Sequence, residues 1–141
     1  MGLSAVLATM PTLSSIAAVG VGAAVGAWLR WGLSFAFNPV FPTIPLGTLA
    51  ANLAGGLLMG IAMELITRHT LLAPELRLLV TTGFLGGLTT FSTFSAEVTT
   101  LLVRREWIWS MLTIGLHVVG SVALTMIGIL AARALFTWGQ P

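Results

Sequence analysis

The chain has 141 residues, of which 57% are apolar and only 7% carry a charge, with a mean hydropathy of +1.03. Because a soluble domain carries roughly a quarter charged residues, this composition excludes an ordinary water-soluble protein and indicates one that lies in lipid. The net charge of +2 comes from arginines scattered between apolar runs, so the sequence has no basic patch of the kind that binds nucleic acid. The absence of cysteine also excludes disulfides, thiol catalysis and thiolate metal sites.

Four apolar runs follow one another along the chain, each near the ~20 residues that cross a bilayer as a helix. They cover about residues 14–36, 46–66, 78–103 and 107–135. Prolines in the segment 38–45 predict a turn after the first run, because proline cannot continue a helix. We therefore expect an all-α integral membrane protein in which residues 1–141 form a single domain of four transmembrane helices. The first run is too long, and the residues before it too uncharged, for a cleaved signal peptide, so residues 1–13 and 137–141 are predicted to be short tails.

Residues along and between the runs predict how the helices meet. Glycines four residues apart allow two helices to pack closely, and the pairs are Gly22 and Gly26, Gly56 and Gly60, and Gly83 and Gly87. A polar loop is expected after the second run, with Arg68, His69, Pro74, Glu75 and Arg77. The spacing of Glu64 and Arg68 predicts an ion pair at the end of a helix. Arg30 lies near the end of the first run, and we expect its side chain to snorkel to the membrane surface.

The arginines give no preferred orientation in the membrane. With four spans they divide three against three: Arg68, Arg77 and Arg133 on one side, and Arg30, Arg104 and Arg105 on the other. Since the side richer in Lys and Arg normally faces the cytoplasm, either the insertion machinery corrects a weak bias or the chain inserts both ways. In the second case two opposed copies would pair about a two-fold axis in the membrane plane. Four thin spans also leave little room for a hydrated pathway within one subunit, which favours a dimer.

The third run is unusual for a membrane helix, because residues 83–95 contain three glycines and five hydroxyl side chains. Each glycine weakens a helix by about 1 kcal/mol relative to alanine, so we expect the helix to break near residues 86–90. Broken backbone survives at bilayer depth only when protein, water or an ion satisfies its carbonyl groups. In two antiparallel copies the carbonyl oxygens would converge at the midplane, which suits a small cation such as sodium. The alternative is a close helix crossing whose hydroxyl groups bond to their own backbone.

Polar and aromatic side chains repeat at helical spacing in three of the runs. The second run carries Thr48 and Asn52 on one face, and the fourth carries Thr113, His117, Ser121 and Thr125. Phe91 and Phe94 share a face of the third run, where their electropositive ring edges can contact an anion or simply pack. Glu97 lies one turn beyond. Together these stripes predict a path lined by neutral donors, which can bind an anion without trapping it.

Four segments of the sequence resemble one known family. The run Gly-Gly-Leu-Thr-Thr-Phe-Ser-Thr-Phe-Ser at 86–95 resembles the signature of Fluc-type (CrcB) fluoride channels. Three further motifs match: Gly-x-x-x-Arg-Trp at 26–31, Gly-Thr-Leu-x-x-Asn-Leu-x-Gly at 47–55, and His-x-x-Gly-Ser at 117–121. The likeness spans nearly the whole chain, in order, and the run in the third span is its most specific part.

The resemblance implies an antiparallel, dual-topology homodimer in the bacterial inner membrane, with two pores for passive fluoride efflux and a buried structural sodium ion. It implies no enzyme activity. By matching position, the backbone carbonyls of Gly86 and Thr89 would hold sodium, the ring edges of Phe91 and Phe94 would line the pores, and Asn52 would donate to fluoride. The remaining pathway residues would be Thr48, Ser92, Thr93, Ser121 and Glu97. Some relatives carry a tyrosine in the fourth span; this chain has none, and Thr113 stands in its place.

Two other functions are compatible with a small four-span protein. A multidrug exporter of similar size needs a carboxylate deep in its first span, where this chain has no acidic residue. An intramembrane protease would need a pair such as Ser92 and His117, but no oxyanion loop is evident. A purely structural membrane subunit is the remaining alternative.

Overall fold

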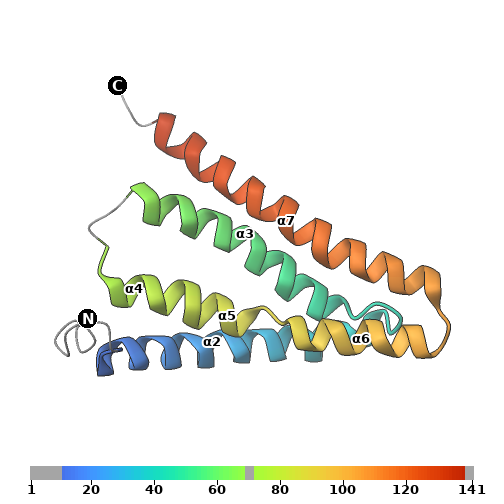
Figure 1. Ribbon diagram of the computed structural model, residues 1–141. Helices are drawn as coiled ribbons and strands as arrows, with labels where there is room; N and C mark the ends of the chain where they lie inside the picture. The colour runs from blue at the N-terminus through green and yellow to red at the C-terminus, as the bar shows by residue number, and fades with distance from the viewer. Residues whose placement is uncertain (1–10, 69–71, 139–141) are drawn as a thin grey trace, which may run out of the picture.

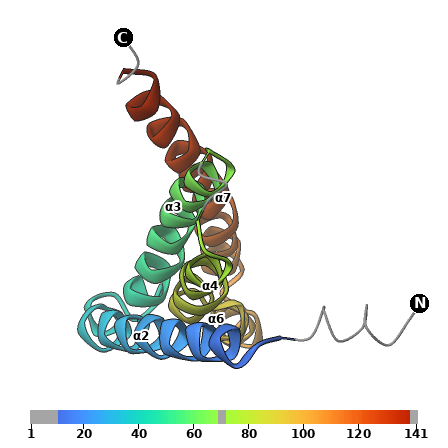
Figure 2. The same ribbon diagram turned by 90° about the vertical axis from the view of Figure 1, so that its left-hand side faces the viewer.

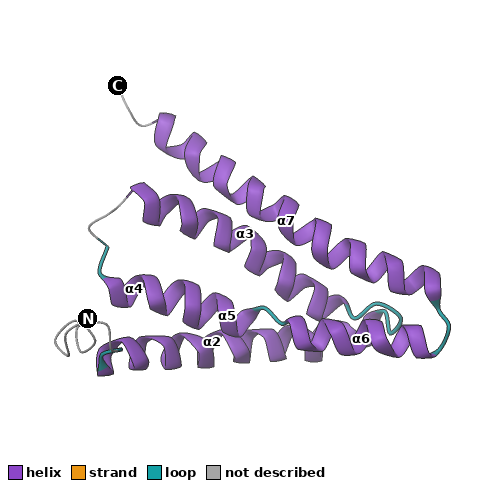
Figure 3. Cartoon of the chain, in the orientation of Figure 1, coloured by secondary structure: helices purple, strands orange, loops and turns teal. Residues whose placement is uncertain are grey.

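The computed structural model describes residues 11–68 and 72–138, and all of its regular elements in those ranges are helices (Figure 3). Most of the two predicted tails, residues 1–10 and 139–141, and His69 of the predicted loop lie outside the described residues. Within the described ranges, three helices are long and apolar enough to cross a membrane. They are α2 (Leu13–Phe37), α3 (Leu46–Arg68) and α7 (Trp107–Trp138).

The predicted third span is a chain of short elements. These are α4 (Pro74–Leu78), the π-helical segment η2 (Leu79–Leu85), α5 (Gly86–Leu88) and α6 (Phe91–Val103). Two residues with extended backbone lie between α5 and α6. Thr89 has φ −85° and ψ 156°, and Thr90 has φ −148° and ψ 117°. The predicted break is therefore confirmed and confined to two residues. The π-helical turn before it was not predicted.

The helices form two closely packed pairs (Figures 1 and 2). In the first pair α2 lies along η2 and α5, and in the second α3 lies along α7. Glycine makes the first contact possible, because a Cβ added to Gly22 or Gly26 would collide with the backbone of Leu79 or Phe84. The predicted close packing of the glycine pairs is thus confirmed here. A small apolar core joins the two pairs; its buried members are Ala51, Ala62, Leu85 and Leu88.

Polar residues fix the ends of these helices. Asn38 begins a short 3₁₀ turn, η1 (Asn38–Val40), and its Oδ1 accepts from the amides of Gly47 (2.8 Å) and Thr48 (3.1 Å), which caps α3. At the other end of α3, Glu64 accepts from Arg68 at 2.6 Å, as predicted. Glu64 also accepts from Arg133 at 2.9 Å, which joins α3 to α7.

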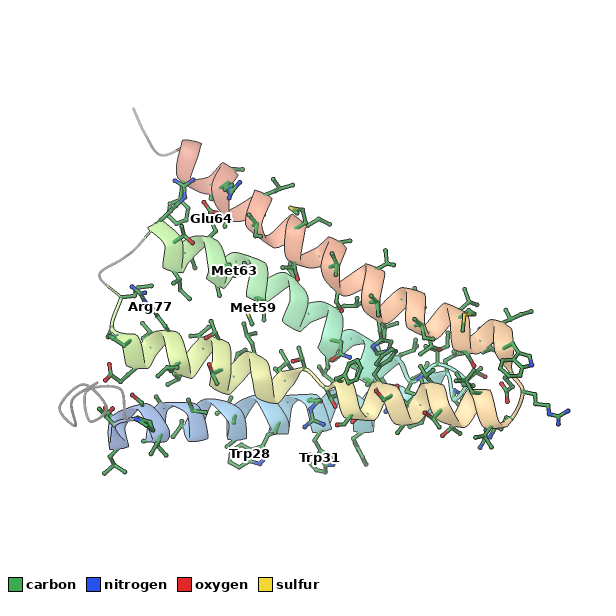
Figure 4. All side chains as sticks on the ribbon, viewed as in Figure 1. Trp28, Trp31, Met59, Met63, Glu64 and Arg77 are labelled. Atoms are coloured by element: carbon green, nitrogen blue, oxygen red, sulfur yellow. The ribbon has the colours of Figure 1, made fainter. Side chains whose placement is uncertain are left out.

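One sequence expectation about the helices needs correction. Pro74, Glu75 and Arg77 lie in α4 rather than in a polar loop, because proline suits the first turn of a helix, where its missing N–H has no partner to lose. Trp28 and Trp31 lie on the outer face of α2, directed away from the other helices, and are 71% and 69% exposed (Figure 4).

Candidate functional site

The main cavity of the described residues, about 440 Å³, lies between α3, the break and α7. Several predicted site residues line it: Asn52, Gly86, Thr89, Phe91, Phe94 and Ser121. His117 and Thr90 also line it, and none of its lining residues is charged. The structure therefore brings the predicted polar faces of α3 and α7 to the break in the third span.

Asn52 is bound to the backbone of the break. Its Oδ1 accepts from the Thr90 amide at 2.7 Å, and its Nδ2 donates to the Thr90 carbonyl at 3.1 Å. A side chain of α3 thus provides the acceptor that the Thr90 amide lacks in the break, as broken backbone at membrane depth requires. It also adds a donor to the Thr90 carbonyl, the N-cap carbonyl of α6.

The two phenylalanines and His117 form a continuous aromatic group. Phe91 and Phe94 contact each other edge to face, with ring centroids 5.7 Å apart and an interplanar angle of 61°. Phe94 in turn stacks on His117, at 4.7 Å and 29°. The shared face of the two phenylalanines is thus confirmed, but their surroundings differ: Phe94 is 8% exposed and Phe91 is 79% exposed.

His117 is the polar end of this group. Its Nδ1 lies 3.0 Å from Asn52 Nδ2. Its Nε2 is buried and has no hydrogen-bond partner among the described residues. Sequence analysis assigned His117 only to a polar stripe; its contacts with Phe94 and Asn52 give it a central position in the site.

A second polar group lies one turn along α3. Thr48 Oγ1 donates to Glu97 Oε1 at 2.6 Å, and Asn38 Nδ2 lies 3.4 Å from the same hydroxyl oxygen. Glu97 Oε2 is buried and accepts from no described residue. Glu97 also lines a separate cavity of about 280 Å³, together with Arg104 and Glu106. The structure therefore places Thr48 and Glu97 together, but outside the lining of the main cavity.

The hydroxyl groups after the break bond mainly to one another. Thr90 Oγ1 donates to Thr93 Oγ1 at 3.0 Å and lies 3.3 Å from the Oγ of the exposed Ser92. Two hydroxyl groups follow the alternative and bond to nearby backbone: Thr89 donates to the Leu85 carbonyl at 2.9 Å, and Thr90 Oγ1 accepts from the Thr93 amide. Ser121 Oγ lies 3.5 Å from the Asn52 carbonyl oxygen. Because the partner of Ser92 is Thr90 while His117 faces Asn52, these two residues do not form the pair that a protease would need.

The break leaves the carbonyl groups of residues 86–89 without their helical donors. In a continuous helix the Gly86 carbonyl would accept from the Thr90 amide, which instead donates to Asn52. Likewise the Thr93 amide, which would bond to the Thr89 carbonyl, donates to Thr90 Oγ1 at 3.1 Å. Gly86 and Thr89, the residues that the resemblance assigns to sodium, are therefore among the residues whose carbonyl oxygens have no helical donor.

Arg30 corrects one expectation. It does not snorkel; its Nε donates to the Gly87 carbonyl in α5 at 3.0 Å, and the side chain is half-buried. The Gly87 carbonyl is one of those that the break leaves without a helical donor, so it can accept from the neighbouring helix α2.

Asn38 and Thr90 are the site residues that sequence analysis missed. Both are helix caps, and both had a signal in the sequence. Asn38 precedes a proline, a common start of a turn, and Thr90 precedes a helix with Thr93 at the third position, which suits an N-cap hydroxyl.

Comparison with known proteins gives a consistent assignment. The model of the CrcB family, described as CrcB-like protein, Camphor Resistance (CrcB), matches residues 17–129. A relative from Nitrosospira multiformis, named fluoride-specific ion channel FluC, is 54% identical over 123 residues, covering 87% of this chain and 96% of its own. Relatives of the same name from Aromatoleum aromaticum and Cupriavidus metallidurans are 55% and 56% identical, covering 91% and 84% of this chain and 98% and 94% of their own. The chain therefore belongs to the CrcB family.

Proposed function

We propose that this chain is the subunit of a fluoride-selective anion channel of the bacterial inner membrane, through which fluoride leaves the cytoplasm passively. The observation that carries the proposal is the uncharged cavity at the break, in which Phe91, Phe94 and His117 meet. The relatives named fluoride-specific ion channel support the choice of anion, because they match this chain over almost all of their length.

Fluoride is small and tightly hydrated, so a selective pore must replace much of its water shell without holding the ion too strongly. Hydroxyl and amide donors do part of this, and the electropositive edges of Phe91 and Phe94 act where no donor fits. A deep lysine or arginine in the pathway would trap the ion instead. The remaining positions along the proposed pathway are Asn52, Thr48, Ser92, Thr93, Ser121 and Glu97.

The direction of transport follows from acid–base chemistry and the membrane potential. Hydrogen fluoride crosses lipid uncharged and ionises in the more alkaline cytoplasm, where the anion is trapped. The potential drives one negative charge outward with about 2.3 kcal/mol per 100 mV, so a passive pore relieves fluoride toxicity. The protein is a channel and not an enzyme.

The proposed assembly is an antiparallel, dual-topology homodimer in which residues 1–141 form one four-span domain and the interrupted segment 74–103 is the third span. The even division of the arginines supports insertion in both orientations. Phe91, which is 79% exposed in one copy, supports a second copy that covers this face. Gly86 gives similar support, because a Cβ added there would meet only the Thr81 carbonyl at 3.9 Å, so nothing within one chain requires glycine.

A structural sodium ion fits this assembly. The carbonyl oxygens of Gly86 and Thr89, whose helical donors are diverted, are hard ligands of the kind that small cations prefer. Two opposed copies would supply four such oxygens. The ion would neutralise the converging carbonyl dipoles and hold the two breaks together.

The test of the function is anion efflux from liposomes that contain the purified protein. Rapid release of fluoride, with chloride retained, is the expected result. Equal release of both anions, or no release from liposomes that contain correctly assembled protein, would contradict the proposal.

A further inference from the structure

We propose that Asn52 and His117 act as a pair, in which Asn52 fixes the tautomer of the imidazole and His117, rather than Asn52, presents the free N–H donor to fluoride. The inference rests on the proposed function, because it assigns the donor in the same cavity. It differs from what the resemblance implies, namely direct donation from Asn52.

The first step is the orientation of the Asn52 amide. The Thr90 N–H can only donate and the Thr90 carbonyl can only accept. The oxygen of Asn52 therefore lies at the Thr90 amide, 2.7 Å away, and its nitrogen lies at the Thr90 carbonyl, 3.1 Å away. The two backbone groups leave only one arrangement of the side chain.

The second step fixes the imidazole. The second hydrogen of Asn52 Nδ2 points to His117 Nδ1, at 3.0 Å. A donor faces this ring nitrogen, so Nδ1 accepts and carries no proton. A neutral imidazole then carries its proton on Nε2.

The N–H groups of Asn52 and His117 differ in whether they are free to bind an anion. Both hydrogens of the Asn52 amide are engaged, one by Thr90 and one by His117, so Asn52 has no N–H to offer an anion. His117 Nε2–H, by contrast, is buried without a partner in the described part of the chain, and the whole side chain is 4% exposed. A buried donor is rarely left unsatisfied, and we assign its acceptor to an anion that enters the cavity lined by His117.

The last step concerns the position of the ring. Phe94 stacks on the imidazole with centroids 4.7 Å apart, which holds its plane. His117 lines the cavity together with Phe91 and Ser121, and no charged side chain lines it. A small anion in this space therefore lies beside the imidazole ring that carries the proposed donor and beside the ring edges.

The tautomer can be measured directly by nitrogen NMR of the dimer in lipid, with histidine labelled. We expect His117 to carry its proton on Nε2, and sodium fluoride, but not sodium chloride, to shift that resonance. Asn52→Asp should move the proton to Nδ1, because a carboxylate there accepts rather than donates. The only other histidine is His69, and His69→Gln identifies the two signals. A proton on Nδ1 in the unaltered protein, or an Nε2 resonance that does not shift when fluoride is added, would overturn the proposal.

Efflux from liposomes gives an independent test. His117→Phe keeps the stacked ring but removes both nitrogens, and we expect it to lower fluoride efflux about tenfold or more. His117→Gln restores an amide donor near the position of Nε2, so its loss should be clearly smaller. His69→Gln is the matched control and should conduct normally. Equal fluoride efflux from the unaltered protein and from His117→Phe would overturn the proposed role of His117 but not the proposed function. No fluoride efflux from the unaltered protein would overturn the proposed function, and the NMR measurement would then decide the role of Asn52 and His117.

Discussion

Asn52 and Thr90, 38 residues apart in the sequence, exchange two hydrogen bonds, one through the amide and one through the carbonyl of Thr90. Thr90 is one of the two extended residues that interrupt the third span. The same asparagine bonds to His117 on α7. One side chain of α3 thus joins the break to α7.

Asn52→Asp is expected to abolish fluoride efflux. The carboxylate cannot donate to the Thr90 carbonyl, and its negative charge repels an anion in the cavity. The loss of this hydrogen bond to the Thr90 carbonyl should lower the free energy of unfolding by about 0.5–1.5 kcal/mol. Efflux assays, with gel filtration to check assembly, measure both effects. An Asn52→Asp dimer that conducts fluoride normally would show that this amide has no part in the pathway.

Phe91→Ile and Phe94→Ile should both reduce fluoride efflux severely, because isoleucine keeps apolar bulk but has no electropositive ring edge. Their effects on stability should differ. Phe94 is buried and stacks on His117, so its replacement should cost about 1 kcal/mol in the free energy of unfolding. Phe91 is 79% exposed in one chain, so its replacement should leave the subunit fold intact.

If the two phenylalanines merely pack, transport should survive in both variants. Fluoride and chloride efflux, measured with circular dichroism and gel filtration on the same samples, separates these outcomes. Normal fluoride efflux from both isoleucine variants would remove the phenylalanines from the pathway.

Local signals in the sequence predicted the long helices and the break. Apolar runs located α2, α3 and α7, and glycine with clustered hydroxyl residues located the interruption at Thr89 and Thr90. The helical spacing of Phe91 and Phe94 correctly placed them on one face. These features depend on residues within a few turns of one another, which is why a single sequence contains them.

Partners that come from distant segments could not be predicted in this way. Arg30 reaches Gly87, 57 residues away, and Arg133 joins the Glu64–Arg68 pair from 69 residues away. Each of these bonds depends on which helix lies beside which, and the polar pattern of one helix does not specify that. The tautomer of His117 could not be predicted for the same reason, since it follows from a hydrogen bond between α3 and α7.

Adjacent glycines offer a matched pair of substitutions for the proposed sodium site. Gly87→Ala should prevent normal folding, because its Cβ would collide with the backbone of Ala23, whose Cα would lie 3.0 Å away. A Cβ at residue 86 meets only the Thr81 carbonyl, at 3.9 Å, so in Gly86→Leu we expect the subunit to fold but to lose the ion and the dimer. Thr89→Ser should retain both, because the proposed ligand is a main-chain oxygen.

The measurement is the stability of the dimer in sodium, compared with a large organic cation at equal ionic strength. Unaltered protein and Thr89→Ser should be more stable in sodium, and Gly86→Leu should show no difference. A dimer of unaltered protein that is indifferent to sodium would contradict the assignment of the ion.

The arginine distribution predicts that reporters fused to the C-terminus will be found on both sides of the membrane. Glu64 pairs with Arg68 and Arg133, but acidic residues contribute little to orientation, so the division remains three against three.

Two arginines added to the C-terminal tail should hold that end in the cytoplasm, whereas two glutamines at the same positions should not. Since an antiparallel dimer needs both orientations, the arginine variant should lose fluoride efflux when it is expressed alone. A second copy can be biased the opposite way by replacing Arg68 and Arg77 with glutamine, which leaves Arg104 and Arg105 in excess on the other side. Co-expression of the two copies should restore fluoride efflux. A single orientation of the unmodified chain, or normal efflux from a uniformly oriented population, would rule out the antiparallel assembly.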